Sequence, residues 1–222
     1  MNTEWMDEVA RRAALHAALS DPGRLAVVEL LSRGDASPSE LARTLAVPSN
    51  LLAHHVNVLV EHGLVERTRS EGDGRRTYLR LLPVDLGTGP GALPRPARVL
   101  FVCTANSARS HLAVALWRSA SDVPAASAGT HPAPAVHPGA VAAAARHDLT
   151  LGDARPRLLD DVRQDGDLVV TVCDRAHEEV DVDADVHWSI PDPVRAGTDD
   201  AFDRAVVALD RRVALLAPRL VA

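Results

Sequence analysis

The sequence contains no lysine, few aromatic residues and only two cysteines. All 24 basic residues are arginine, and Phe, Trp and Tyr together make up 3% of the 222 residues. The hydrophobic cores must therefore be built mainly from Leu, Val and Ala. Cys103 and Cys173 are too few for a disulfide framework, and this excludes the class of small secreted domains that disulfides hold together.

Long apolar runs are also missing. No stretch approaches the roughly 20 residues of a membrane-spanning helix, and the first residues lack the charged and apolar regions of a signal peptide. The formal net charge of −6 argues against a uniformly basic surface for nucleic acids, although local positive patches remain compatible with it. We therefore expect a cytoplasmic protein without a membrane segment.

Residues 84–96 are rich in proline and glycine and show neither helical nor strand periodicity. Such a segment is typical of a linker. Residues 1–83 before it follow a mainly helical pattern. Residues 97–222 after it alternate strand-like and helical runs, which indicates an α/β domain with a parallel sheet. The sequence therefore predicts two domains joined by this linker.

The first domain contains the pattern of a winged helix-turn-helix. Residues 37–40 form a capping box with a proline at the first helical position, and this predicts a short helix that ends at Leu45. After a turn, a longer helix is predicted over residues 49–62. Residues 64–69 and 76–82 alternate at strand period around a glycine-containing turn, which predicts a β-hairpin wing.

The longer helix is expected to bury its apolar face and to leave a polar face available to DNA. The arginines of the wing suit contacts with phosphate. The predicted DNA contacts are Ser49, Asn50, His54, Asn57, Arg75 and Arg76. Further positive charge on the wing comes from Arg67, Arg69 and Arg80. For His55, DNA contact and helix packing both remain open.

Residues 4–83 resemble the arsenic-repressor (ArsR/SmtB) family of winged-helix transcriptional regulators. The resemblance is carried by residues 37–59, by residues 61–66 and by the wing. It implies a homodimer that represses transcription from a near-palindromic operator and is released by an inducer. Ser37 and Ser39 stand where arsenite- and metal-sensing members carry a Cys-x-Cys pair. Because this domain contains no cysteine, a thiolate arsenite site of that kind cannot form in it.

The second domain begins with a segment suited to holding a tetrahedral oxyanion. The apolar run 99–102 ends on Cys103, a loop of small residues follows, and Arg109 and Ser110 open a helical pattern. The backbone N–H groups of such a loop and the N-terminus of a helix carry positive partial charge. The predicted oxyanion-binding residues of the loop are Thr104, Ala105, Asn106, Ser107 and Ala108.

The polar residues of this segment have distinct predicted roles. Arg109 offers a planar fork that binds two oxygens at once. The same positive field favours the thiolate of Cys103, which we expect to be the nucleophile. Ser110 can donate a hydrogen bond to that thiolate, and Asn106 tolerates the left-handed backbone of a tight loop. The alternative is a buried strand-end cysteine near an arginine by chance, which the order of strand, loop, Arg-Ser and helix disfavours.

Residues 97–222 resemble the low-molecular-weight protein tyrosine phosphatase fold, which includes thioredoxin- and mycothiol-linked arsenate reductases. The resemblance rests on residues 103–110, 127–130, 167–173 and 187–193. It implies a three-layer α/β domain with a four-stranded parallel sheet. It also implies that Asp192 protonates the leaving oxygen as a general acid. Ala105 stands where members usually have glycine, and Ala108 stands where many have a second cysteine.

The fate of the cysteine adduct distinguishes a phosphatase from an arsenate reductase. A phosphatase hydrolyses a phosphocysteine, whereas in a reductase a thiol attacks the arsenic adduct, releases arsenite and leaves a disulfide. The resemblance implies two further cysteines in thioredoxin-linked members, and here Cys173 occupies the first position and Val180 the second. Either Cys173 resolves Cys103 directly, or an external thiol does so, such as mycothiol with a mycoredoxin, or thioredoxin. Cys173 can equally be a buried structural residue.

We predict an arsenate reductase fused to a DNA-binding transcriptional regulator of arsenic resistance, and a homodimer formed through the first domain. Residues 131–137 offer no aromatic side chain to flank a phosphotyrosine ring, which favours a reductase over a tyrosine phosphatase. A regulator that only senses the oxyanion is the other alternative. The expected partners are operator DNA, arsenate or phosphate, and the external thiol. No resident cofactor and no metal are expected, because the histidines lack metal-ligand spacing.

Overall fold

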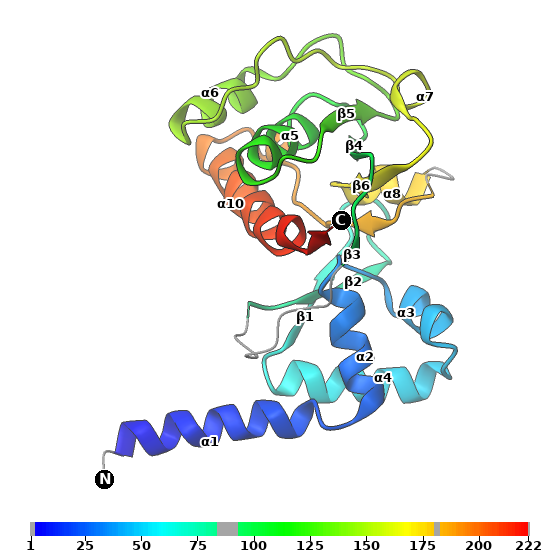
Figure 1. The fold of residues 1–222 in the computed structure, drawn as a ribbon, viewed down its shortest axis with the longest axis vertical. Coiled ribbons are helices and arrows are strands. Elements are labelled where there is room, and N and C mark those ends of the chain that lie inside the picture. Colours follow the sequence, from blue (N-terminus) through cyan, green and yellow to red (C-terminus); the bar gives the residue numbers. More distant parts are fainter. Residues whose placement is uncertain (1–2, 84–92, 180–182, 222) are drawn as a thin grey trace. The chain divides into compact units, whose positions relative to one another are not determined.

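The computed structural model describes residues 3–83, 93–179 and 183–221 (Figure 1). The chain divides into two compact units. The first comprises Met1–Arg69 and Arg75–Gly91, and the second comprises Ser70–Gly74 and Ala92–Ala222. Within the part of the chain that the structure describes, no helix is both long and apolar enough to cross a membrane.

The first unit contains four helices and a two-stranded hairpin among its described residues. The two strands are antiparallel, with Val65 paired to Leu81 and Arg69 paired to Thr77. The predicted helix-turn-helix and wing are therefore confirmed, with ends that differ by one or two residues from those expected. The elements are α1 (Thr3–Ala18), α2 (Pro22–Leu31), α3 (Pro38–Leu45), α4 (Ser49–Glu61), β1 (Val65–Arg69) and β2 (Thr77–Leu81).

Local chemistry fixes the turn between α3 and α4. The Ser37 side chain accepts a hydrogen bond from the backbone N–H of Glu40, and the Glu40 carboxylate accepts one from the backbone N–H of Ser37. This is the predicted capping box. At the other end of α3, Ala46 takes a left-handed conformation with φ of 52°. The chain therefore leaves α3 sharply, and α4 then buries Leu52, Val56 and Leu59 in the core of the unit.

The second unit is built around a four-stranded parallel sheet with strand order β5-β4-β6-β7. β4 lies in the interior of the sheet, and its residues from Val99 to Cys103 are buried. α5 packs against α10, while α8 packs against β4 and β6. The sheet strands are β4 (Arg98–Cys103), β5 (Ala125–Gly129), β6 (Asp167–Thr171) and β7 (Val186–His187). The helices are α5 (Arg109–Ala120), α6 (Pro138–Arg146), α7 (Leu159–Val162), α8 (Asp174–Glu179), α9 (Pro193–Ala196) and α10 (Asp199–Leu216).

The few aromatic residues of the second unit gather in its core. The ring centroid of Phe101 lies 5.7 Å from that of Trp117 and 5.6 Å from that of Trp188. At the start of β4, the Arg98 guanidinium donates to both carboxylate oxygens of Asp167 at 2.8 and 2.6 Å. Arg98 and Asp167 are also paired residues of neighbouring strands. The ion pair therefore fixes the register of β4 and β6 at the end of the sheet away from Cys103.

The predicted linker over residues 84–96 is only partly covered by the structure. Residues 84–92 lie outside the described residues, as does Val180. Leu93 and Pro94 form a short strand, β3 (Leu93–Pro94), which pairs in parallel with β8 (Leu220–Val221). β8 follows the 3₁₀ helix Ala217–Arg219. The end of the predicted linker therefore has regular pairing with a segment that lies far away in the sequence.

Candidate active site

The segment from Cys103 to Ser110 lies at the carboxyl end of β4, where the carboxyl ends of parallel strands commonly form ligand sites. Cys103 ends the strand, and α5 begins at Arg109. No side chain caps the N-terminus of α5, because the N-cap residue is Ala108. The first N–H groups of the helix therefore remain available to a bound anion.

The carbonyl groups of the loop are held by a segment that follows β5. The backbone N–H groups of His131, Ala133 and His137 donate to the carbonyls of Thr104, Ala105 and Ser107, respectively. The donor–acceptor distances are 2.9, 2.9 and 2.8 Å. The segment after β5 thus supports the loop from outside. Sequence reasoning missed this role of residues 131–137, because it depends on contacts with a segment almost 30 residues earlier.

Gly129 at the end of β5 is required by the close approach of the loop. A Cβ atom on Gly129 would lie 2.7 Å from the carbonyl oxygen of Thr104 and 2.9 Å from the Cβ of Asn106. Both distances are shorter than real Cβ contacts. The glycine therefore lets β5 lie directly beside the loop. Ala105, in contrast, has no positive φ, so its methyl group causes no strain of that kind.

The sulfur of Cys103 is surrounded by hydrogen-bond donors. The backbone N–H of Asn106 donates to it at 3.2 Å, and the Oγ of Ser110 lies 3.1 Å away. The Asn106 side-chain amide donates to the Ser110 Oγ at 2.8 Å, which leaves the Ser110 hydroxyl hydrogen free to point to the sulfur. Both groups are thus placed to donate a hydrogen bond to the sulfur. Cys103 is 3% exposed.

Asn106 fixes the loop in its tight conformation. Its φ of 45° lies in the left-handed region, which asparagine tolerates better than most residues. Its side-chain Oδ1 accepts a hydrogen bond from the backbone N–H of Arg157 at 2.9 Å. Asn106 is fully buried, and its amide group links the loop, Ser110 and residue 157. Arg157 thus adjoins this site through its main chain.

Arg109 extends from the start of α5 to the loop before α9. Its Nη1 donates to the carbonyl of Ile190 at 2.9 Å, and its Nη2 lies 3.2 Å from the Oδ2 of Asp192. Burial acts to lower the pKa of Arg109, but the charges of Cys173, Cys103 and Asp192 outweigh it, and the pKa lies above its ordinary value. The guanidinium thus stays charged beside both thiols.

Asp192 is positioned by the short helix that it caps. Its Oδ1 accepts from the backbone N–H of Val194 at 3.1 Å, and Pro193 occupies the first helical position. The other oxygen faces Arg109. The side chain is 33% exposed and lies at the wall of the cavity beside the loop. This arrangement suits a general acid.

Cys173 lies beside the first residue of the loop. Its sulfur accepts a hydrogen bond from the backbone N–H of Thr104 at 3.3 Å, and the Thr104 hydroxyl lies 3.4 Å away. Burial raises the pKa of Cys173 above its ordinary value; the Arg109 charge opposes this shift, and the Cys103 charge adds to it. Cys173 is therefore held as a neutral thiol next to the nucleophile's loop.

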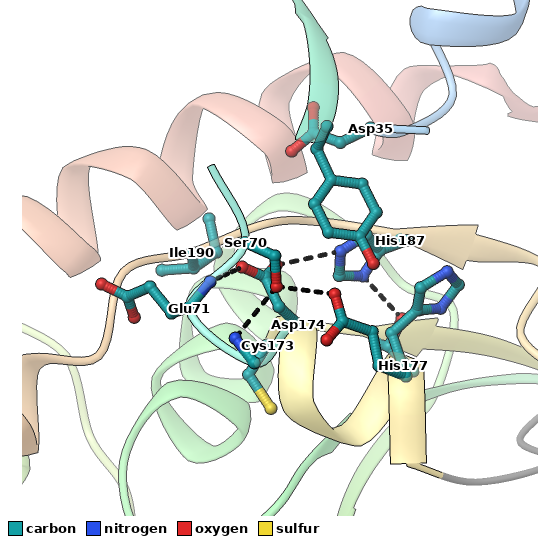
Figure 2. A network of polar contacts seen from close by, with 12 residues as sticks. Asp35, Ser70, Glu71, Cys173, Asp174, His177, His187 and Ile190 are labelled. Atoms are coloured by element: carbon teal, nitrogen blue, oxygen red, sulfur yellow. Dashed lines mark hydrogen bonds and ion pairs between the residues drawn. The ribbon is translucent and has the colours of Figure 1, made fainter. Parts of the chain in front are cut away.

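A buried histidine, His187, lies close to Asp174 and His177, and sequence reasoning missed this arrangement. His187 Nε2 lies 3.2 Å from the Asp174 carboxylate, and its Nδ1 lies 2.9 Å from the Thr171 hydroxyl. Its ring stacks on His177 with centroids 4.1 Å apart. Figure 2 shows Asp174 and His187 in contact near Cys173, with His177 beside His187. Burial acts to raise the pKa of Asp174, but hydrogen bonds such as that from His187 outweigh it, and the pKa lies below its ordinary value.

These elements surround a cavity of about 360 Å³. Its walls include the loop from Cys103 to Arg109 without Asn106, the segment Cys173–Arg175, and Asp192, Val194 and Arg195. None of the described residues that line it is aromatic. The described part of the chain also contains no group of three or more His, Cys, Asp or Glu side chains placed to hold a metal ion. The site is thus a small polar cavity lined by two thiols, three arginines and the carboxyl groups of Glu71, Asp174 and Asp192.

In the first unit, the predicted DNA contacts are available on the surface. Ser49, Asn50, His54 and Asn57 on α4 are exposed, and so are Arg75 and Arg76 before β2. His55 is only 7% exposed and lies 3.6 Å from Asp21, so helix packing is its role. Arg80 was expected to add to the basic wing, but its guanidinium lies 3.6 Å from Asp35 and 3.4 Å from Glu66. Its charge is therefore neutralised inside the unit.

The fold and the loop define a protein with a phosphatase-type oxyanion site that also carries a helix-turn-helix domain. A family model described as low molecular weight phosphotyrosine protein phosphatase matches residues 98–222, and the chain belongs to this family. A model of a helix-turn-helix domain matches residues 19–68. The predicted fusion of these two domains is therefore confirmed. No curated protein is matched by this chain.

Solved structures of this fold resemble the second unit. An arsenate reductase from Archaeoglobus fulgidus is 33% identical, covers 54% of this chain and 98% of its own, and has a TM-score of 0.47. The tyrosine phosphatase Wzb from Escherichia coli K30, solved with sulfate, is 22% identical, covers 55% and 97%, and has a TM-score of 0.50. The tyrosine phosphatase AmsI from Erwinia amylovora is 21% identical, covers 57% and 95%, and has a TM-score of 0.50. The last two likenesses describe the fold alone.

Proposed function

We propose that the second unit is a thiol-linked arsenate reductase and that the first unit makes the chain a transcriptional regulator of arsenic resistance. The observation that carries the proposal is the second thiol at the loop. A phosphatase of this fold needs one cysteine, yet the Cys173 sulfur accepts a hydrogen bond from Thr104, the residue next to the nucleophile. A second sulfur in this place suits chemistry that ends in a disulfide.

The first chemical step uses Cys103, Arg109 and Asp192. The backbone N–H groups of the loop and the Arg109 guanidinium hold the oxygens of arsenate. The Cys103 thiolate forms a sulfur–arsenic bond while an arsenic–oxygen bond breaks. Asp192 supplies the proton with which the leaving oxygen departs as water. The product is an adduct in which arsenic(V) is bound to Cys103.

The second step reduces the arsenic. A thiolate attacks the Cys103 sulfur, the sulfur–arsenic bond breaks, and its electron pair stays on arsenic, which leaves as arsenite. The two sulfurs remain as a disulfide, so two electrons have passed from the thiols to arsenic. The attacking thiol is either Cys173 or an external thiol, such as mycothiol with a mycoredoxin, or thioredoxin. An external dithiol then reduces the disulfide and restores Cys103.

The cavity also supports a small inorganic substrate over a phosphotyrosine side chain. Phosphotyrosine is an aryl phosphate, and an aromatic side chain stacks favourably on its ring. The described lining of the 360 Å³ cavity is polar or aliphatic. Arsenate needs only the loop, Arg109 and the proton donor. The proposed preference for arsenate over phosphotyrosine therefore rests on the side chains that line the cavity.

For the first unit we propose binding to an operator as a homodimer. The exposed polar face of α4 and the arginines before β2 are suited to base and phosphate contacts. The hydroxyl groups of Ser37 and Ser39 lie 3.0 Å apart. Hydroxyl groups are poor ligands for arsenite compared with thiolates. We therefore propose that arsenic chemistry in this chain takes place at Cys103.

The enzymatic part is tested by measuring arsenite formed from arsenate. The full-length chain is assayed with thioredoxin and, separately, with mycothiol and mycoredoxin, and it is compared with the Cys103→Ser and Cys173→Ser variants. The wild type should form arsenite with at least one reductant, and Cys103→Ser should form none above background. If the wild type and Cys103→Ser do not differ in either system, the reductase is wrong. Turnover of an aryl phosphate without arsenite formation would instead assign a phosphatase.

The regulatory part needs a separate measurement. Binding sites are selected with the full-length chain from random duplex DNA, and affinity for a selected duplex is measured by fluorescence anisotropy. The Asn50→Ala and Arg76→Ala variants should bind more weakly, whereas Arg204→Ala on α10 should bind as the wild type does. Adding arsenate or arsenite separately to the binding assay tests whether the oxyanion site acts as a sensor. Equal affinity of all variants for selected and random DNA would contradict operator binding.

A further inference from the structure

The second unit contains a further cavity of about 410 Å³ beside the oxyanion loop. It is bounded by α5, by the first residues of β5 and by the segment from Thr150 to Arg157. None of its lining residues also lines the active-site cavity. Its size falls in the range of pockets for small ligands, roughly 300–1,000 Å³. It is therefore a separate place where a small molecule can bind.

Three arginines line this second cavity. Arg118 lies in the last turn of α5, and Arg155 and Arg157 lie on the facing segment. All three are exposed, and within the described part of the chain no carboxylate forms an ion pair with any of them. Asp153 is the one acidic residue of the lining. The cavity is thus positively charged, and arginine forks match the oxygens of a phosphate group.

A buried histidine at the wall lacks a hydrogen-bond partner. His111 lines the cavity and is 5% exposed. Its Nδ1 lies 3.1 Å from the Ser127 Oγ, but its Nε2 is buried without a partner among the described residues. Burial lowers the pKa of His111, the Asn106 main chain opposes this shift, and the Arg157 charge adds to it. Because Nε2 is inaccessible, His111 forms part of the wall of the cavity and does not offer that atom to a ligand.

The remaining wall is apolar. Val114, Ala115 and Leu151 contribute aliphatic surface to the cavity. A free phosphate ion would use the charged side alone. A phosphorylated organic molecule would place its phosphate at the arginines and its organic part on the aliphatic surface.

We propose that this second cavity binds a phosphate-bearing small molecule, held by Arg118, Arg155 and Arg157 with His111 at the wall. The site is connected to the oxyanion loop by the main chain. The backbone N–H of Arg157 donates to Asn106, and His111 follows Ser110, whose Oγ lies 3.1 Å from the Cys103 sulfur. A ligand bound in this cavity would therefore lie next to the residues that position Cys103.

The test uses the full-length Arg109→Ala variant, in which the loop has lost its arginine and so binds phosphate weakly. Binding of adenosine diphosphate, inorganic diphosphate and adenosine is measured by isothermal titration calorimetry. Adenosine diphosphate or inorganic diphosphate should bind at one site per chain, and comparison of the two shows whether the ligand's organic part contributes. Adenosine should not bind. Adding Arg155→Ala and Arg157→Ala together should weaken the binding at least about 10-fold, since charge-assisted hydrogen bonds to phosphate are lost.

The matched control is Arg204→Ala in the same background. Arg204 is an exposed arginine on α10 that pairs with Asp200, so its removal should leave the affinity unchanged. A second readout is the ring proton signal of His111 in NMR spectra, assigned with His111→Gln, which should shift on addition of the ligand that binds. The proposal is wrong if neither phosphate compound binds, if adenosine binds equally well, if the double substitution changes nothing, or if the His111 signal stays in place.

Phosphate binding at this second cavity goes beyond the proposed arsenate reductase. The titrations are made with a variant that lacks Arg109 and therefore require no turnover. Failure to form arsenite in the wild type would leave the binding result unchanged. Absence of ligand binding would likewise leave the arsenate assay unchanged.

Discussion

Cys103 and Cys173 follow neighbouring strands of the same parallel sheet, yet their sulfurs have different surroundings. Both side chains are buried, and both sulfurs accept a backbone N–H. After Cys103 the chain forms a loop that ends in Arg109 and Ser110, and Ser110 lies 3.1 Å from the sulfur. After Cys173 the helix α8 begins at once, and burial raises the pKa of the thiol. The chain segment after each strand therefore gives each sulfur its own surroundings, and these favour Cys103 as the proposed nucleophile.

Burial at the end of a strand does not by itself activate a thiol, as the difference between the two cysteines shows. A thiolate needs donors and positive charge that compensate for its lost hydration. The Cys103 loop provides them from Asn106, Ser110 and Arg109. Cys173 shares Arg109 and accepts hydrogen bonds from the backbone N–H groups of Thr104 and Ala176, but burial still raises its pKa. In the proposed reaction it attacks only after Cys103 has formed an adduct.

The largest expected effect comes from replacing each of the two cysteines with serine in a separate variant. Cys103→Ser should lower kcat for hydrolysis of para-nitrophenyl phosphate by at least about 10⁴-fold, because the nucleophile is lost. Cys173→Ser should keep this activity within about 10-fold, because the sulfur is not needed to form or hydrolyse a phosphocysteine. Steady-state kinetics at saturating substrate measures both. Equal losses in the two variants would remove the distinction between the cysteines.

A smaller effect is expected from the proton donor at the nucleophile's cavity. Asp192→Asn should lower kcat/KM by about 10²–10⁴-fold for phenyl phosphate, whose leaving group needs a proton. The loss should be much smaller for para-nitrophenyl phosphate, whose leaving group is stable as an anion. Asp199→Asn on α10 serves as the control, because its side chain pairs with Arg146 outside the cavity. An equal loss with both substrates would contradict a role in proton transfer.

The register of β4 and β6, the two strands that lead to the cysteines, depends on the ion pair at the ends of these strands away from the cysteines. Asp167→Asn should lower the free energy of unfolding by roughly 3 kcal/mol, because it breaks a bidentate ion pair with Arg98. The Asp167 side chain in this pair is only 2% exposed. The Arg98 side-chain hydrogen bonds and the backbone N–H of Gln164 outweigh burial and lower the pKa of Asp167. Urea unfolding measures the loss.

The sign of the pH dependence follows from that lowered pKa. The stabilisation by Asp167 is fully present above the ordinary aspartate pKa of about 4 and is lost as the pH falls through the lower value of the folded state. The difference between wild type and Asp167→Asn should therefore shrink on acidification. Asp203→Asn, which removes an exposed partner of Arg146, should have a much smaller effect at neutral pH. A pH-independent difference would show that Asp167 acts without its charge.

The smallest effect is expected from one hydroxyl group. Ser110→Ala should slow alkylation of Cys103 by iodoacetamide about 10-fold at neutral pH, because a hydrogen bond to the thiolate is lost. Ser119→Ala, on the same helix but bonded to the carbonyl of Ala115, should leave the rate unchanged. Mass spectrometry identifies the alkylated residue. An unchanged rate in Ser110→Ala would assign the activation to the backbone and Arg109 alone.

Much of the first unit could be predicted because its information is local. The capping box at Ser37 and Glu40, the turn at Ala46 and the spacing of apolar residues on α4 all lie within a few residues of each other. Pairings across the unit could not be predicted in the same way. His55 is buried next to Asp21, and Arg80 pairs with Asp35, which lies 45 positions earlier in the chain.

In the second unit, too, local features could be predicted from the sequence and contacts between distant segments could not. The order of strand, Cys103, loop, Arg109 and helix predicted an oxyanion cradle, because each part is next to the other in the chain. The supports of the loop come from residues 131–137 and from Arg157, and their role depends on hydrogen bonds that join distant segments. The pair of Asp174 and His187 likewise forms only when β7 lies next to β6.

The sequence by itself determined the helix-turn-helix, the parallel α/β pattern and the loop that follows Cys103, because periodicity, capping and loop composition act over short stretches of chain. Only the tertiary structure decided the environment of each thiol, since burial and charge come from side chains that are distant in the sequence. It also decided that the Cys173 sulfur accepts a hydrogen bond from Thr104 and that one cavity is lined by Arg118, Arg155 and Arg157. Electrostatic effects depend on distance in space and on burial, and neither is encoded in a local pattern.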